Sequence, residues 1–176
     1  MLLLAEQAGH SKGGRSKMKI LIATDGSEFS NSAIDEILRY HTDTQTEVRI
    51  VTVVEPLVNT VGAPFGVLDT YYATYLKDAR ERAEKVLEKA EARFREGAGE
   101  GVNVSGKVLI GKAGQEIVDE AARWPADLIA VGSHGRGFWE RAYLGSVSNS
   151  VTHHAPCNVL VVRGNAGSKL GEELPR

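Results

Sequence analysis

The sequence is poor in cysteine and in long apolar runs, and its charges nearly cancel. One cysteine, Cys157, stands among 176 residues, which excludes an internal disulfide framework and a multi-cysteine zinc site. The 21 Lys and Arg against 23 Asp and Glu give a net charge of -2, which argues against a basic field that attracts nucleic acid. No apolar stretch reaches the length of a membrane span, and the apolar start at residues 1–5 is too short for a signal peptide. These absences predict a cytoplasmic protein with neither a nucleic-acid nor a membrane partner.

Length and composition predict one folded domain. The chain has 176 residues, of which 42% are hydrophobic, and this share is enough to build a core. Residues 1–17 lack a clear period and end in Gly-Gly-Arg-Ser-Lys, so we expect a flexible leader there. Residues 164–176 are similar in character and predict a flexible tail. The domain is therefore expected at residues 18–163.

Strand-like and helix-like segments alternate along this domain. The expected strands span residues 19–23, 48–54, 102–110, 127–131 and 158–162. A first expected helix follows a cap at Ser27, and three more span residues 71–96, 116–122 and 146–154, with a loop at residues 55–69. Strict alternation predicts a parallel sheet with helices on both faces. Strand 102–110 is expected at an edge because it carries several polar residues.

A glycine-rich segment follows the fourth expected strand. Residues 132–137 read Gly-Ser-His-Gly-Arg-Gly and are followed by Gly145 and Ser146, a spacing of Gly-x2-Gly-x9-Gly-Ser. A strand that ends in glycines and leads into a helix presents backbone N–H groups and the positive end of the helix dipole to phosphates. The chain has no Gly-x4-Gly-Lys-Ser/Thr motif and no Gly-x-Gly-x2-Gly after the first strand. The spacing therefore predicts a nucleotide site that is neither a P-loop nor a dinucleotide fingerprint.

The opposite wall of this site is expected at the first strand. Ligands of an open α/β sheet bind beyond the carboxyl ends of its strands, where the strand order reverses. Asp25 follows the first strand and is expected either to accept hydrogen bonds from ribose hydroxyls or to help hold a magnesium ion that also binds phosphates. Gly132 and Gly135 allow close approach of the backbone. The hydroxyls of Ser146 and Ser148 are expected to donate to phosphate oxygens.

Other side chains near the motif have smaller expected roles. Val53 could flank an adenine ring, and Arg136 and Arg141 could add positive charge. His134 is the single local candidate for a general base, so the site is better equipped to hold a nucleotide than to hydrolyse it. The adjacent histidines at residues 153–154 point about 100° apart on a helix, which favours a helix C-terminal role over a metal site. Cys157 is expected to be a buried structural thiol.

The two ends of the domain resemble the universal stress protein family. Residues 18–27, which read Met-Lys-Ile-Leu-Ile-Ala-Thr-Asp-Gly-Ser, look like its first strand, and residues 132–163 look like its C-terminal block. The glycine spacing is similar to that of the ATP-binding branch of the family. The resemblance implies an open five-stranded parallel sheet of order 3-2-1-4-5, of the adenine nucleotide α hydrolase-like class. It also implies a homodimer that pairs the last strand, Val159 to Val162, across a two-fold axis.

Motif and resemblance together imply one set of contact residues for ATP, with Mg²⁺ at Asp25. The set comprises Ala23, Thr24, Asp25, Val53, Val131, Gly132, Gly135, Arg136, Gly145, Ser146, Val147 and Ser148. The loop departs from the family pattern in its aromatic residues Phe138, Trp139 and Tyr143, so its packing is not implied by the resemblance.

Three functions remain open at this point. The first is an ATP-binding stress-response protein that acts as a nucleotide-dependent sensor or switch. The second is a slow ATPase or phosphotransferase. The third is a dimeric interaction module that binds no ATP or holds another nucleotide such as AMP.

Overall fold

The computed structural model describes residues 17–40, 46–56, 67–99, 101–135 and 144–164, and within these only the backbone of residues 67–71. Most of the predicted leader and tail, together with Arg136, Arg141, Phe138, Trp139 and Tyr143, lies outside the described residues. The elements in chain order are β1 (Met18–Ala23), α1 (Glu28–Tyr40), β2 (Thr46–Val54), α2 (Val67–Ala98), β3 (Asn103–Ile110), α3 (Ala113–Arg123), β4 (Leu128–Gly132), α4 (Ser146–His154) and β5 (Asn158–Val162).

The strands form one parallel sheet of order β3-β2-β1-β4-β5, which confirms the predicted fold class. Ile20 of β1 is in register with Val48 of β2 on one side and with Leu128 of β4 on the other. The chain leaves β1 toward β2 and β3 and later returns to β4 on the opposite flank. The strand order therefore reverses between β1 and β4, as the site prediction requires.

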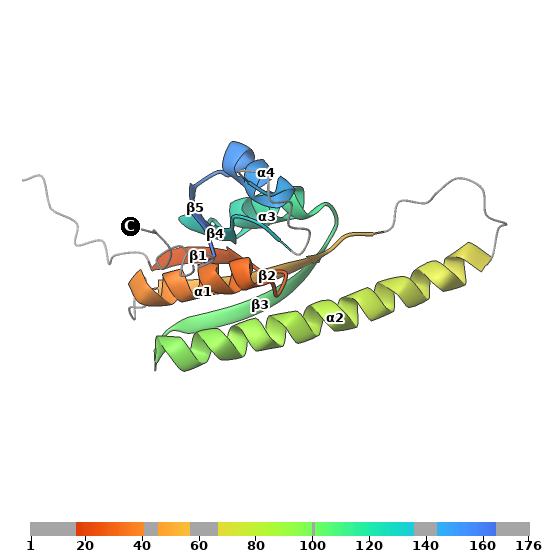
Figure 1. Cartoon of the computed structure of the whole chain (residues 1–176), viewed down its shortest axis with the longest axis horizontal. Coiled ribbons are helices and arrows are strands. Elements are labelled where there is room, and N and C mark those ends of the chain that lie inside the picture. Colours follow the sequence, from red (N-terminus) through yellow and green to blue (C-terminus); the bar gives the residue numbers. More distant parts are fainter. Residues whose placement is uncertain (1–16, 41–45, 57–66, 100, 136–143, 165–176) are drawn as a thin grey trace, which may run out of the picture.

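Helices cover both faces of the sheet (Figure 1). Helices α1 and α2 pack on one face around a core that includes Ile22, Ile34 and Phe94. Helices α3 and α4 pack on the other face around a core that includes Leu21 and Ile129. Since successive strand residues point to opposite faces, the apolar run of β1 supplies both cores.

Three elements begin two or more residues earlier than predicted. Helix α2 begins at Val67, inside the segment expected to be a loop, and its N-terminal end extends past the sheet (Figure 1). Strand β2 begins at Thr46. Helix α3 begins at Ala113, three residues before the predicted start. Its capping acceptor is the Glu55 carboxylate, which accepts from the Ala113 N–H at 2.8 Å, so no local cap residue marks this start in the sequence.

A carboxylate is buried between the sheet and α3. Glu120 is 1% exposed and receives hydrogen bonds from Arg49 of β2 at 2.8 Å, Lys107 of β3 at 2.8 Å and Arg123 at 3.2 Å. The guanidinium of Arg49 also lies 4.5 Å from the ring centre of Trp124. Burial alone would raise the pKa of Glu120, but the hydrogen bonds from Lys107 and Arg49 lower this pKa below its ordinary value. The cluster fixes α3 against β2 and β3.

Candidate functional site

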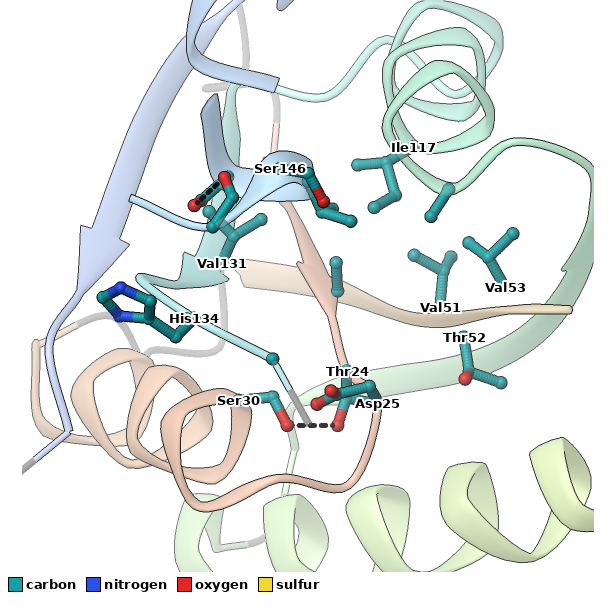
Figure 2. A pocket seen from close by; sticks show the side chains of 17 residues that line it. Thr24, Asp25, Ser30, Val51, Thr52, Val53, Ile117, Val131, His134 and Ser146 are labelled. Atoms are coloured by element: carbon teal, nitrogen blue, oxygen red, sulfur yellow. Dashed lines mark hydrogen bonds between the residues drawn. The ribbon is translucent and has the colours of Figure 1, made fainter. Parts of the chain in front are cut away.

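A cavity of about 310 Å³ opens at the carboxyl ends of β1 and β4 (Figure 2). This volume falls within the range of small-molecule sites. The cavity is lined by every predicted contact residue that the structure describes, namely Ala23, Thr24, Asp25, Val53, Val131, Gly132, Gly135, Gly145, Ser146, Val147 and Ser148. The structure thus brings residues from three strands and one helix to one place. Arg136 lies outside the described residues.

The cavity also has lining residues that the sequence analysis missed. They are Ser30, Val51, Thr52, Ala113, Ile117 and His134, the last of which was considered only as a general base. Val51 could have been found from strand alternation, because it lies on the same face of β2 as Val53. Ala113 was missed because the start of α3 was placed too late. In Figure 2, Val51, Val53 and Ile117 form the apolar end of the cavity.

Gly132 and Gly135 each lie too close to a neighbouring group to carry a side chain without a shift, but the neighbouring groups differ. A Cβ atom at Gly132 would lie 2.7 Å from the carbonyl carbon of Phe29, in the first turn of α1. The packing of α1 against β4 therefore requires glycine here, whatever the ligand. A Cβ atom at Gly135 would instead lie 2.9 Å from Asp25 Oδ2. Gly135 therefore brings the loop after β4 against the carboxylate that follows β1.

The N-terminus of α4 differs from those of α1 and α3. Helix α1 is capped by Ser27, whose hydroxyl accepts from the Ser30 N–H at 3.3 Å, and α3 is capped by Glu55. Helix α4 begins after Gly145, which makes no side-chain capping bond, and its first intrahelical bond runs from the Asn149 N–H to the Gly145 carbonyl at 2.9 Å. The N–H groups of residues 146–148 thus precede this bond. These donors and the helix dipole favour an anion at this end of the cavity.

Ser148 holds the two ends of the glycine loop together. The residue is 1% exposed, and its hydroxyl lies 2.9 Å from the Ser133 carbonyl and 3.0 Å from the Gly145 carbonyl, donating to the backbone. The Gly145 N–H also donates to the Ser133 carbonyl at 2.8 Å. Because a hydroxyl carries one hydrogen, this arrangement places the Ser148 hydroxyl in loop bracing, whereas the sequence predicted donation to phosphate. Its backbone N–H remains one of the three at the helix start.

The turn after β1 fixes the orientation of Asp25. The Ser27 N–H donates to Asp25 Oδ1 at 3.0 Å, and the Gly26 N–H donates to the Thr24 hydroxyl at 3.1 Å. Gly26 has a φ of 79°, a left-handed conformation that favours glycine. The Thr24 and Ser30 hydroxyls lie 3.0 Å apart, which ties this turn to α1 (Figure 2). The carboxylate is thereby held in the cavity wall.

His134 lines the cavity and contacts Phe29 and Ser133. Its ring lies 5.4 Å, centre to centre, from the ring of Phe29 at a tilt of 55°. Its Nδ1 lies 3.1 Å from the Ser133 hydroxyl. These contacts orient the imidazole along the loop after β4.

Metal-ligating side chains do not gather in the described part of the chain. Among the residues described, no group of three or more His, Cys, Asp or Glu side chains could hold a metal ion. His154 Nδ1 lies 2.8 Å from the Ser150 carbonyl in the last turn of α4, as a helix C-terminal role predicts. Cys157 is only half-buried, less than predicted, and this burial and the nearby Asp127 raise the pKa of its thiol, which keeps it protonated. None of the described helices is both long and apolar enough to span a membrane.

Fold and cavity together define an open parallel α/β protein with a ligand site at its topological switch point. Residues 18–163 match the family model of the universal stress proteins, and the chain belongs to that family. Universal stress protein YxiE of Bacillus subtilis is 30% identical over 148 residues, which cover 82% of this chain and 98% of the relative. Universal stress protein MJ0531 of Methanocaldococcus jannaschii is 33% identical over 145 residues, which cover 82% of this chain and 81% of the relative.

Solved structures of the family share the fold. Universal stress protein UspA from Lactobacillus plantarum superposes with a TM-score of 0.72 at 24% identity, covering 84% of this chain and 98% of its own. A family protein from Arabidopsis thaliana, solved with AMP bound, gives 0.60 at 19% identity over 88% of this chain and 97% of its own. A universal stress protein in complex with cAMP gives 0.58 at 21% identity over 85% of this chain and 98% of its own.

Proposed function

We propose that this protein binds an adenine nucleotide, ATP in the first place, in the cavity between β1 and β4. The observation that carries the proposal is the pairing of an apolar end with an anion-binding end in one cavity. Val51, Val53 and Ile117 form the first, and the N-terminus of α4 forms the second. A nucleotide has the same two halves, a flat apolar base and a charged phosphate chain. The AMP and cAMP complexes of structural neighbours support the same ligand class.

The phosphates are placed at the glycine loop and α4. Gly132, Gly135 and Gly145 leave the backbone accessible, and the N–H groups of residues 146–148 with the Ser146 hydroxyl are the donors. The base is placed against Val53, beside Ala23 and Val131, which also line the cavity. The ribose then lies between these ends, beside Asp25, whose carboxylate accepts from its hydroxyls.

A magnesium ion fits this site only in company with the phosphates. Asp25 is the one carboxylate among the described lining residues of the cavity. Mg²⁺ is often bound by one or two carboxylates, several waters and substrate phosphates, so Asp25 and the phosphate chain would hold it jointly. Bound there, the ion would neutralise phosphate charge.

The site is built to hold the nucleotide and to report its presence. His134 contacts Phe29 and Ser133, and no lysine lines the cavity among the residues described. A bound phosphate chain would tie the loop after β4 to α4 and so stabilise one loop conformation over others. Such a change in loop conformation is the physical basis of a nucleotide-dependent switch in a stress response. We propose that the protein acts in the cytoplasm.

A second part of the proposal is a homodimer formed through β5. This strand lies at the sheet edge, beside β4 alone, and Val159 to Val162 are all apolar and half-buried. An apolar edge strand is a template for pairing with a second copy.

Calorimetric titration of the full chain with ATP, with and without Mg²⁺, tests the nucleotide proposal. We expect saturable binding that weakens at least about tenfold in Ser146→Ala, because one phosphate donor is lost. Ser32→Ala is the matched control, because the Ser32 hydroxyl donates to the Glu28 carbonyl on the exposed side of α1. Absence of binding at millimolar ATP contradicts the proposal. Phosphate release that survives Ser146→Ala and Asp25→Ala would point to a contaminating ATPase.

A further inference from the structure

A second cavity, of about 440 Å³, adjoins the nucleotide cavity. The two cavities share Asp25, Thr52 and Val53 in their walls. The rest of the second cavity is formed by the end of β2 and by turns of α2, including Arg82 and Lys85. The proposed contacts of the adenine nucleotide leave this space unused.

Thr52 lies at the junction of the two cavities. The residue is 5% exposed, and its side chain lies on the opposite side of β2 from Val51 and Val53, toward α2 (Figure 2). Within the described part of the chain, its hydroxyl has no hydrogen-bond partner. Because Thr52 lines both cavities, its hydroxyl can donate to or accept from a polar group of a ligand there.

The two carboxylates of the second cavity are both engaged with helix N-termini. Glu55 accepts from the Ala113 N–H at 2.8 Å at the start of α3. Asp25 accepts from the Ser27 N–H at 3.0 Å ahead of α1. Backbone donors and helix dipoles thus offset part of the negative charge in this wall.

The positive charges of Arg82 and Lys85, the two cations of the second cavity, are not offset by ion pairs to any described residue. Elsewhere on α2, ion pairs join Arg80 to Glu84 at 3.0 Å and Arg95 to Glu91 at 2.6 Å. Among the described residues, Arg82 and Lys85 have no ion-pair partner. Two such cations one helical turn apart are suited to bind a phosphate group.

We propose that the second cavity binds a phosphate group on the 2′ or 3′ hydroxyl of the nucleotide's ribose, with Arg82, Lys85 and Thr52 as its contacts. This inference rests on the proposed function, which places the ribose at Asp25. With the base and the 5′ phosphates held in the first cavity, the ribose hydroxyls face the wall that the two cavities share. The preferred ligand is therefore an adenine nucleotide that carries a phosphate on the 2′ or 3′ hydroxyl in addition to its 5′ phosphates.

The test compares AMP with adenosine 3′,5′-bisphosphate and adenosine 2′,5′-bisphosphate by calorimetric titration of the full chain. We expect one bisphosphate to bind at least about tenfold more tightly than AMP, a gain typical of a charge-assisted phosphate contact. The double variant Arg82→Gln/Lys85→Gln should lose this gain and keep the AMP affinity. Thr52→Val should reduce the gain. The matched control is Lys77→Gln/Lys89→Gln, which removes two charges from α2 outside both cavities and should keep the gain.

Two results overturn the inference without touching the proposed function. One is AMP binding with no preference for either bisphosphate. The other is a preference that persists in Arg82→Gln/Lys85→Gln or is lost equally in the control. If neither AMP nor ATP binds to the wild-type chain, the proposed function itself fails, and this inference fails with it.

Discussion

Asp25 and Gly135 lie side by side in the cavity wall, such that a Cβ atom at Gly135 would lie 2.9 Å from Asp25 Oδ2. These residues follow β1 and β4, the two strands between which the order of the sheet reverses. The contact joins the two walls of the site, so a substitution at Gly135 also tests the role of Asp25.

Gly135→Ala should weaken nucleotide binding more than it destabilises the protein. The added methyl group meets only the end of the Asp25 side chain, which can rotate away if it gives up the hydrogen bond from the Ser27 N–H. We therefore expect the melting temperature to fall by only about 2 °C. Rotation displaces the carboxylate from the ribose, so the ATP affinity should fall about tenfold. Calorimetry and thermal melting of one preparation measure both effects. An unchanged ATP affinity would show that Asp25 does not contact the nucleotide.

Gly132→Ala should destabilise the protein more than it weakens nucleotide binding. Its methyl group would meet the Phe29 backbone at 2.7 Å, which cannot move without shifting α1. Overpacking of this kind costs about 1–3 kcal/mol, so we expect a clear loss in the free energy of unfolding, measured in urea without ligand. A stability equal to that of Gly135→Ala would contradict the packing role assigned to Gly132.

Ser148→Ala should loosen the glycine loop. The variant removes the hydroxyl that donates to the Ser133 and Gly145 carbonyls in a buried setting, at a cost of about 1–2 kcal/mol. We expect the ATP affinity to fall as well, because ordering the loop then opposes binding. Ser146→Ala should lower the affinity while leaving the free energy of unfolding within about 0.5 kcal/mol of wild type. Equal stability of the two variants would contradict the bracing role of Ser148.

Glu120→Gln should destabilise the protein by about 2 kcal/mol at neutral pH, since it removes the buried charge that pairs with Arg49, Lys107 and Arg123. The pKa of Glu120 is lowered in the folded protein, so its stabilisation is present above the ordinary value of 4.5 and is lost as the pH falls through the folded-state value. The stability difference between wild type and variant should therefore shrink below pH 4.5. A difference that is constant down to pH 2.5 would contradict this linkage.

The strand alternation, the sheet class and the glycine spacing could be read from the sequence because each depends on residues close together in the chain. The reason for Gly132 could not, because the backbone of Phe29 lies far from it in the chain and meets it only in the folded structure. The start of α3 was missed for the same reason, since its cap is the distant Glu55. Val53 was identified as a site residue, yet its neighbour Thr52 was not. Alternation places Thr52 on the other face of β2, where α2 forms the second cavity.

The proposed β5 interface is tested with two apolar-to-lysine variants at opposite edges of the sheet. Val162→Lys places a charge on β5 at a residue that belongs to neither core cluster, and Ile110→Lys does so on β3, where Ile110 is half exposed. An edge lysine opposes strand pairing between two copies. We therefore expect Val162→Lys to shift the mass measured by light scattering from dimer to monomer at micromolar concentration, while Ile110→Lys stays dimeric. Circular dichroism melts show whether both variants remain folded. A monomeric wild type, or a dimer that only Ile110→Lys disrupts, would place the interface away from β5.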